Sequence, residues 1–150
     1  MATKNTADMK YRILDDVAIA DVAFEIYGKD LHELFENAAL AIFEQSADIT
    51  TIKGEKKRSI DISSNALDTL FFDFLSELLY LKDAEQLLGK AAKVHIAQNK
   101  SEYTLQAEIV GDVISQQKHT LKSDIKAVTY HMFKIEETPK GWVAFVVVDI

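Results

Sequence analysis

Residues 68–81 read DTLFFDFLSELLYL, and the spacing of their apolar side chains predicts an amphipathic helix. Asp68, Asp73 and Glu77 fall on the opposite side of this helix, where we expect solvent. Phe72 lies outside the apolar stripe, and we therefore expect it to contact a loop or a partner. The stripe itself consists of Leu67, Leu70, Phe71, Phe74, Leu75, Leu78 and Leu79.

An earlier segment has the same helical spacing, and we expect this helix to run from about Leu31 to Gln45. Asp30, followed three residues later by Glu33, has the pattern of a capping box, which satisfies the free N–H groups at a helix start. The apolar stripe of this helix consists of Leu31, Leu34, Phe35, Ala38, Ala39, Ile42 and Phe43. Both helices need an apolar surface to cover.

Strand patterns surround the two helices. Residues 20–27 alternate as a half-buried strand does and end at Gly28. Further strand patterns occur around residues 60–62, 94–96, 103–109, 124–136 and 142–149, with turns predicted at Gly111-Asp112 and within ETPKGW. This order predicts an α+β domain, in which two amphipathic helices cover a largely antiparallel or mixed sheet. We expect one domain at residues 11–150, preceded by a flexible tail at residues 1–10.

The chain is acidic, with 17 Lys and Arg against 24 Asp and Glu and a net charge of −7. This charge opposes stable binding to free nucleic acid, although KGEKKR (53–58) and KHTLKSDIK (118–126) are locally basic. The chain has no cysteine, which excludes disulfides and thiolate metal sites. The longest apolar run, Trp142 to Val148, is too short to cross a bilayer, so we expect a cytoplasmic protein with no membrane partner.

The common phosphate-loop, dinucleotide, metalloprotease and hydrolase motifs are absent from the chain. The four histidines, His32, His95, His119 and His131, lack the i, i+4 spacing of metal ligands. A hydrogen-bonded structural role is the simpler interpretation of each. Carboxylates are therefore the stronger candidates for chemistry.

The chain ends in FVVVDI, where Asp149 extends an apolar strand beside the terminal carboxylate of Ile150. Asp21 is a second carboxylate on a mainly apolar strand. If the three carboxylates converged, their repulsion would call for a hard cation such as Ca²⁺ or Mg²⁺ between them. On the pattern alone, the simpler interpretation is that Asp21 and Asp149 face solvent on separate edges.

Four segments together resemble the archease family: GKDLHELFENAALAIFE (28–44), DTLFFDFLSELLYL (68–81), DIKAVTYH (124–131) and the terminal VVVDI. The resemblance runs from about Tyr11 to Ile150, and KAVTYH combined with a C-terminal DI is its specific part. It implies a non-enzymatic accessory protein that activates an RtcB-type RNA-splicing ligase. The expected effect is to promote guanylylation and multiple turnover of that ligase in tRNA splicing and RNA repair.

The resemblance also implies a metal site formed by Asp21, Asp149 and Ile150. The expected ligand is a divalent cation, Ca²⁺ first, with Mg²⁺ or Mn²⁺ as alternatives. The family's D-H-T-A-D-I motif falls on Val17 to Val22, so Asp21 keeps the metal-binding aspartate. Val17-Ala18-Ile19 replaces D-H-T and removes its histidine, which leaves the cation's surroundings less polar.

Lys126, His119 and His131 fall in or near the matching C-terminal segment, and we expect them on the partner-binding surface. For Lys126, an ion pair with Asp124 is an equally good interpretation.

Two other functions remain open. A metal-dependent hydrolase would need a general base beside the metal, and a chaperone-like binding module would show an exposed apolar patch around Phe72.

Overall fold

The computed structural model describes residues 9–14 and 21–150 of the chain, which form two helices, one short 3-10 helix and seven strands. The elements in chain order are β1 (Tyr11–Leu14), β2 (Asp21–Gly28), α1 (Leu31–Ser46), η2 (Ile49–Thr51), β3 (Lys56–Ser64), α2 (Leu67–Glu85), β4 (Leu87–Asn99), β5 (Glu102–Val113), β6 (Ala127–Thr138) and β7 (Gly141–Asp149). Every strand pair in this part of the chain is antiparallel. The α+β class and both predicted helices are confirmed.

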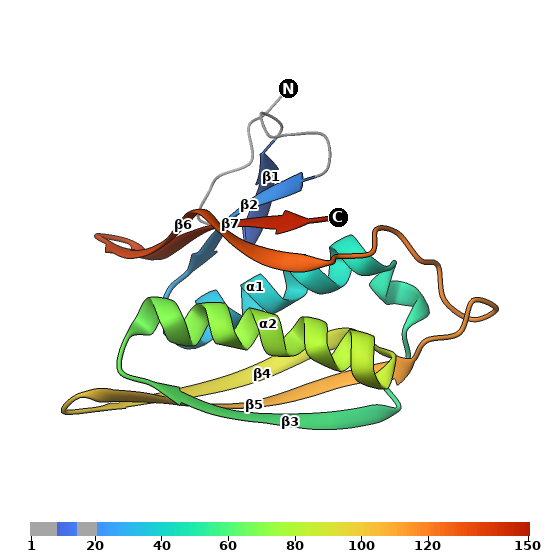
Figure 1. The fold of residues 1–150 in the computed structure, drawn as a ribbon, viewed down its shortest axis with the longest axis horizontal. Coiled ribbons are helices and arrows are strands. Elements are labelled where there is room, and N and C mark those ends of the chain that lie inside the picture. Colours follow the sequence, from blue (N-terminus) through green and yellow to red (C-terminus); the bar gives the residue numbers. More distant parts are fainter. Residues whose placement is uncertain (1–8, 15–20) are drawn as a thin grey trace.

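The strands divide into two sheets, with both helices between them (Figure 1). One sheet has the order β1-β2-β7-β6, and the other has the order β3-β5-β4. Helix α1 contacts β2 and β4, and α2 contacts β3 and β6, so each helix packs against both sheets. The sequence predicted helices that cover one sheet, whereas the structure has two sheets. A helix with a wide apolar face can bury that face against two sheets at once. The buried residues of α2 are Leu70, Phe71, Phe74, Leu75, Leu78, Leu79 and Leu81.

Two sequence predictions about local structure have opposite outcomes. The capping of α1 is confirmed, because the carboxylate of Asp30 accepts the N–H of Glu33 at 2.9 Å. The turn predicted at Gly111-Asp112 is wrong, because β5 continues through both residues. Gly111 lies opposite a bulge in β4, where a Cβ atom would collide with the carbonyl of Leu88. The glycine therefore permits a close approach of two strands and does not form a turn.

The free edge of β4 is covered by side chains from α1. The N–H of Val94 donates to Glu36 Oε2 at 2.8 Å, and the N–H of Ile96 donates to His32 Nδ1 at 3.1 Å. Four residues along a helix span about 6 Å and two residues along a strand about 6.7 Å, so the donors and acceptors match. The ring of His32 also stacks on His95, with centroids 5.3 Å apart. Two N–H groups that could pair with another strand are thereby satisfied.

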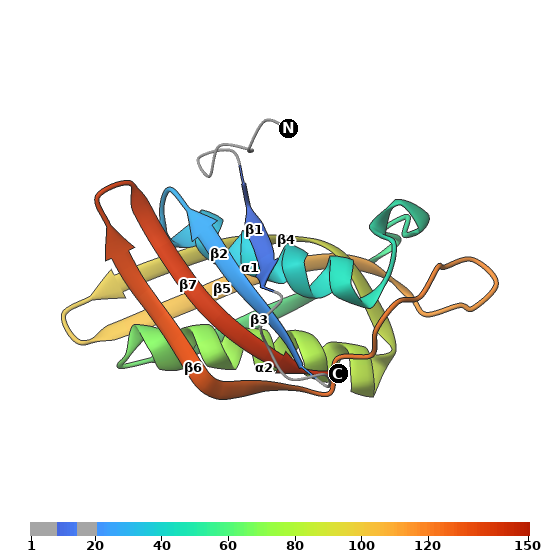
Figure 2. The same cartoon turned by 90° about the horizontal axis from the view of Figure 1, so that it is seen from above.

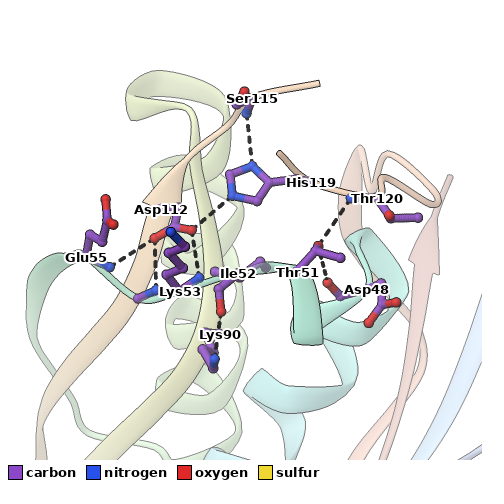
Figure 3. Close-up of polar contacts among 11 residues, drawn as sticks. Asp48, Thr51, Ile52, Lys53, Glu55, Lys90, Asp112, Ser115, His119 and Thr120 are labelled. Atoms are coloured by element: carbon purple, nitrogen blue, oxygen red, sulfur yellow. Dashed lines mark hydrogen bonds and ion pairs between the residues drawn. The ribbon is translucent and has the colours of Figure 1, made fainter. Parts of the chain in front are cut away.

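A polar cluster around Asp112 joins the end of β5 to the segment before β3 (Figure 3). The Asp112 carboxylate accepts backbone N–H groups at 2.8–2.9 Å from Lys53, Gly54 and Glu55. His119 Nε2 lies 2.9 Å from the same carboxylate, while its Nδ1 accepts the N–H of Ser115 at 3.0 Å. His119 is therefore the neutral tautomer that donates through Nε2. This cluster holds Ser115 and His119 in the segment that leads from β5 to β6, and the N–H groups of Lys122 and Ser123 bind the end of α1.

Loss of the α1 side chains should open the β4 edge. We expect the double variant Glu36→Ala, His32→Ala to speed amide exchange at Val94 and Ile96 by at least about fivefold, because each bond contributes about 1 kcal/mol or more. Association that rises with protein concentration should accompany this change. Hydrogen exchange followed by NMR measures the first effect and sedimentation the second. Asp73→Ala, an exposed carboxylate of α2, is the control, and unchanged exchange in the double variant would refute the role of these side chains.

The Asp112 cluster predicts a pH-dependent contribution to stability. Burial alone would raise the pKa of Asp112, but the N–H donors of Glu55, His119, Lys53 and Gly54 outweigh it and hold this pKa well below its usual range. The stabilisation is therefore fully present above about pH 4, the ordinary value for aspartate, and is lost as the pH falls further.

Asp112→Asn should lower the free energy of unfolding by about 2 kcal/mol at pH 7, because an amide cannot accept all four donors. Urea unfolding at several pH values measures this change. The difference from the wild type should shrink as the pH falls from about 4 to about 2, because Asp112 takes up a proton more readily in the unfolded chain than in the fold. Asp61→Asn, an exposed position on β3, is the control. A difference that stays constant down to pH 2 would contradict the assignment.

Candidate metal centre

Asp21 and Asp149 lie directly opposite each other at one end of the four-stranded sheet. Asp21 begins β2 and Asp149 ends β7, and the antiparallel register makes them partners. Directly opposed residues place their side chains on the same face of the sheet, with Cβ atoms about 5 Å apart. Asp21 and Asp149 are therefore neighbours in the sheet. The interpretation that they face solvent on separate edges is wrong.

The preceding valines hold this end of β7 in place. Strand β7 lies between β2 and β6, and Val146, Val147 and Val148 are buried. The side chain of Ile150 packs against the core. The carbonyl of Asp149 accepts the N–H of Lys126 at 2.8 Å. Asp149 and Ile150 are thus anchored on both sides, which fixes their backbone.

The two carboxylates repel each other when both are charged. A hydrogen bond with Asp149, partial desolvation and the negative charge of Asp149 raise the pKa of Asp21, and nearby His131 partly opposes this shift. The repulsion between two such carboxylates is removed either by one proton that they share or by a cation that lies between them. Both side chains remain accessible, because Asp149 is exposed and Asp21 is only partly buried.

The donor set suits a hard cation. Within residues 9–14 and 21–150, no three side chains of His, Cys, Asp or Glu come together in a way that could hold a metal ion. The third donor of the predicted site is the main-chain carboxylate of Ile150, which follows Asp149 directly. Carboxylate oxygens from these three residues are the donors that Ca²⁺, Mg²⁺ and Mn²⁺ prefer. Val17, Ala18 and Ile19, which replace the family's D-H-T, lie outside the described residues.

The three partner-surface candidates have different positions. His131 is exposed on β6 and close enough to Asp21 to affect its pKa. Lys126 is exposed beside the end of β7, and Asp124 pairs with Lys82 at 2.7 Å, which is not the pairing considered for Lys126. The prediction for His119 is wrong, because this side chain is buried, with 6% of the residue exposed, and is bound to Asp112.

An aromatic group beside His131 was not predicted in full. Phe72 of α2 stacks on Tyr130 of β6, with centroids 3.9 Å apart and ring planes within 5°. Phe133 packs edge-on against both rings. Tyr130 is 70% exposed and Met132 is 66% exposed. Phe72 was expected to contact a loop or a partner, but in the structure it contacts a strand of the same chain, β6.

In the described residues, no helix is both long enough and apolar enough to cross a membrane.

Comparison with known proteins places the chain in a family. The model of the "Archease protein family (MTH1598/TM1083)" matches residues 11–150. Protein archease of Methanosarcina acetivorans is 39% identical over 142 residues, which cover 94% of this chain and 96% of that protein. Protein archease of Pyrococcus furiosus is 39% identical over 132 residues, covering 87% of this chain and 93% of that protein.

A solved structure gives the same result for the fold. The solution structure of Methanobacterium thermoautotrophicum protein 1598 superposes with a TM-score of 0.82 and is 34% identical in sequence. The match covers 94% of this chain and 99% of that one. Because the family model matches residues 11–150, and because relatives 39% identical are matched over more than nine-tenths of their own length, the chain belongs to the archease family.

Proposed function

We propose that this protein is a non-catalytic activator of an RtcB-type RNA ligase, and that the end of the molecule bearing Asp21, Asp149 and Ile150 is its working end. Family membership supports the partner class, and the direct pairing of Asp21 with Asp149 is the observation that supports the working end. The ligase supplies the chemistry of nucleotidyl transfer. The activator raises the rate of guanylylation and allows repeated turnover.

Asp21, Asp149 and the carboxylate of Ile150 would hold a divalent cation, with Ca²⁺ as the first candidate and Mg²⁺ or Mn²⁺ as alternatives. When bound, the ion supplies positive charge that can stabilise negative phosphate oxygens. The residues of this chain provide the rigid backbone: the buried valines of β7 and the bond from Lys126 fix the positions of the donors. A fixed donor geometry lowers the cost of reorganisation when a partner docks.

The surroundings of the carboxylates suit a protein partner. Lys126, His131 and the exposed ring of Tyr130 lie on or next to β6, whose first residue pairs with Asp149. Exposed aromatic side chains such as that of Tyr130 are enriched in protein interfaces. The net charge of −7 favours approach to a basic surface, such as an RNA-binding enzyme presents.

A metal-dependent hydrolase is the second candidate, because His131 near Asp21 offers the general base that this function requires. The exposed Tyr130 and Met132 near Phe72 are the feature on which a chaperone-like module would depend. Both alternatives make the protein active without a ligase, whereas the proposed activator has no activity on its own.

Single-turnover guanylylation of an RtcB-type ligase from the same organism tests the proposal, with and without this protein and divalent ions. We expect the wild type to raise the rate, and Asp21→Ala and Asp149→Ala to reduce this stimulation by at least about tenfold, because each removes a donor to the ion. Asp61→Ala removes an exposed carboxylate from the other sheet and should stimulate like the wild type.

Full stimulation by Asp149→Ala would refute the working end, and no stimulation by the wild type would refute the ligase as partner. Hydrolysis of a phosphate ester by the protein and Mn²⁺ alone would favour the hydrolase. Circular dichroism of each variant checks that a lost activity is not a lost fold.

A further inference from the structure

The two basic stretches of this acidic chain meet at one pocket. Lys53 and Lys56 come from the stretch at residues 53–58, and Lys118 comes from the stretch at residues 118–126. All three line a pocket of about 380 Å³ at the start of β3 and the end of β5. The volume falls in the range of small-molecule sites, roughly 300–1,000 Å³. The remaining lining residues are Thr51, Glu55, Asp112, Val113, Ser115 and His119.

The lysines are the charges of this pocket that remain available to a ligand. Among the ion pairs between described residues, none involves Lys53, Lys56 or Lys118. The carboxylate oxygens of Asp112 are already bound by three backbone N–H groups and by His119, so they are not free to pair with the lysines. Glu55 is the one other carboxylate among the lining residues, against three ammonium groups.

The wall of the pocket is rigid. The carboxylate of Asp112 accepts hydrogen bonds from the backbone N–H groups of residues 53–55 (Figure 3). Gly54 in this segment has a positive φ of 86°. His119 links the same carboxylate to Ser115, which holds the neighbouring segment in place. The lysine side chains therefore extend from a fixed backbone, which reduces the entropy lost when they converge on a ligand.

The segment after the pocket leads toward the C-terminal strand. Residues 114–126 run from the end of β5 to the start of β6 (Figures 1 and 2), and the N–H of Lys126 binds the carbonyl of Asp149. One segment thus joins a basic pocket to the carboxylate pair. The inference that follows rests on the pocket alone and does not depend on the proposed ligase partner.

We propose that this pocket binds the phosphate group of a phosphomonoester, as carried by a nucleotide or by a phosphorylated RNA end. Ammonium groups bind phosphate oxygens through charge-assisted hydrogen bonds, and three of them suit the dianion of a monoester. The pocket has room for the phosphate and part of the attached nucleoside. The net charge of −7 keeps long nucleic acid away, so the terminal phosphate is the part that binds.

NMR titration of the ¹⁵N-labelled full chain tests the inference, with inorganic phosphate, adenosine 5′-monophosphate, and a short RNA with or without a 5′-phosphate as probes. We expect shifts at Lys53, Lys56 and Lys118 with the three phosphate-bearing probes and none with the 5′-hydroxyl RNA. Tighter binding of the phosphorylated RNA than of the mononucleotide would identify an RNA end as the ligand. Equal binding would identify the mononucleotide phosphate.

The double variant Lys56→Ala, Lys118→Ala should weaken binding of the monophosphate by at least about tenfold. Lys57→Ala is the matched control, because Lys57 adjoins Lys56 in sequence but pairs with Glu108 and does not line the pocket. This control should bind within about twofold of the wild type. Equal weakening by Lys57→Ala, or shifts that are absent or centred elsewhere, would overturn the inference. Ligase stimulation by the Lys56 and Lys118 variants is measured separately, because it tests the proposed activator function and not phosphate binding in this pocket.

Discussion

The antiparallel register between β2 and β7 is the constraint on which the candidate metal centre depends. It pairs eight residues of β2 with eight of β7, from Asp21 with Asp149 at one end to Gly28 with Trp142 at the other. A shift of one residue would turn the side chain of Asp149 to the opposite face of the sheet from Asp21. The register is fixed by the buried residues between these ends, among them Phe24 and Val146, which are partners in the ladder. The apolar core therefore sets the distance between the two carboxylates.

Packing around this ladder explains why the end of the chain is ordered. Both helices lie between the two sheets, and the inner face of β7 is closed by buried side chains. The Asp112 cluster holds Ser115 and His119 in the segment that leads from β5 to β6, the N–H groups of Lys122 and Ser123 bind the end of α1, and the N–H of Lys126 binds the carbonyl of Asp149. The carboxylate pair is thus supported from β2 on one side and from this segment on the other. Two accessible carboxylates that are already held in place bind a cation more tightly than two mobile ones, because they lose less conformational entropy on binding.

The sequence predicted what depends on local spacing. The helix stripes, the Asp30 cap and the strand that ends at Gly28 follow from residues near one another in the chain, and the structure confirms them. The division into two sheets and the pairing of Asp21 with Asp149 depend on contacts between distant residues, which alternation alone does not specify. Gly111 was mistaken for a turn residue because a close strand contact and a turn both favour glycine. His119 was placed on the surface because its partner, Asp112, became visible only in three dimensions.

Paramagnetic broadening by Mn²⁺ in NMR spectra tests whether Asp21, Asp149 and Ile150 hold a divalent cation. The amide signals of Val22, Val148 and Lys126 should broaden first. The indole signal of Trp142, about 24 Å away along the same ladder, should remain sharp at equal Mn²⁺. One residue added after Ile150 should remove the local broadening, because it converts the terminal carboxylate into a peptide bond. Broadening that is absent, centred on another acidic surface, or unchanged by the added residue would contradict the claim.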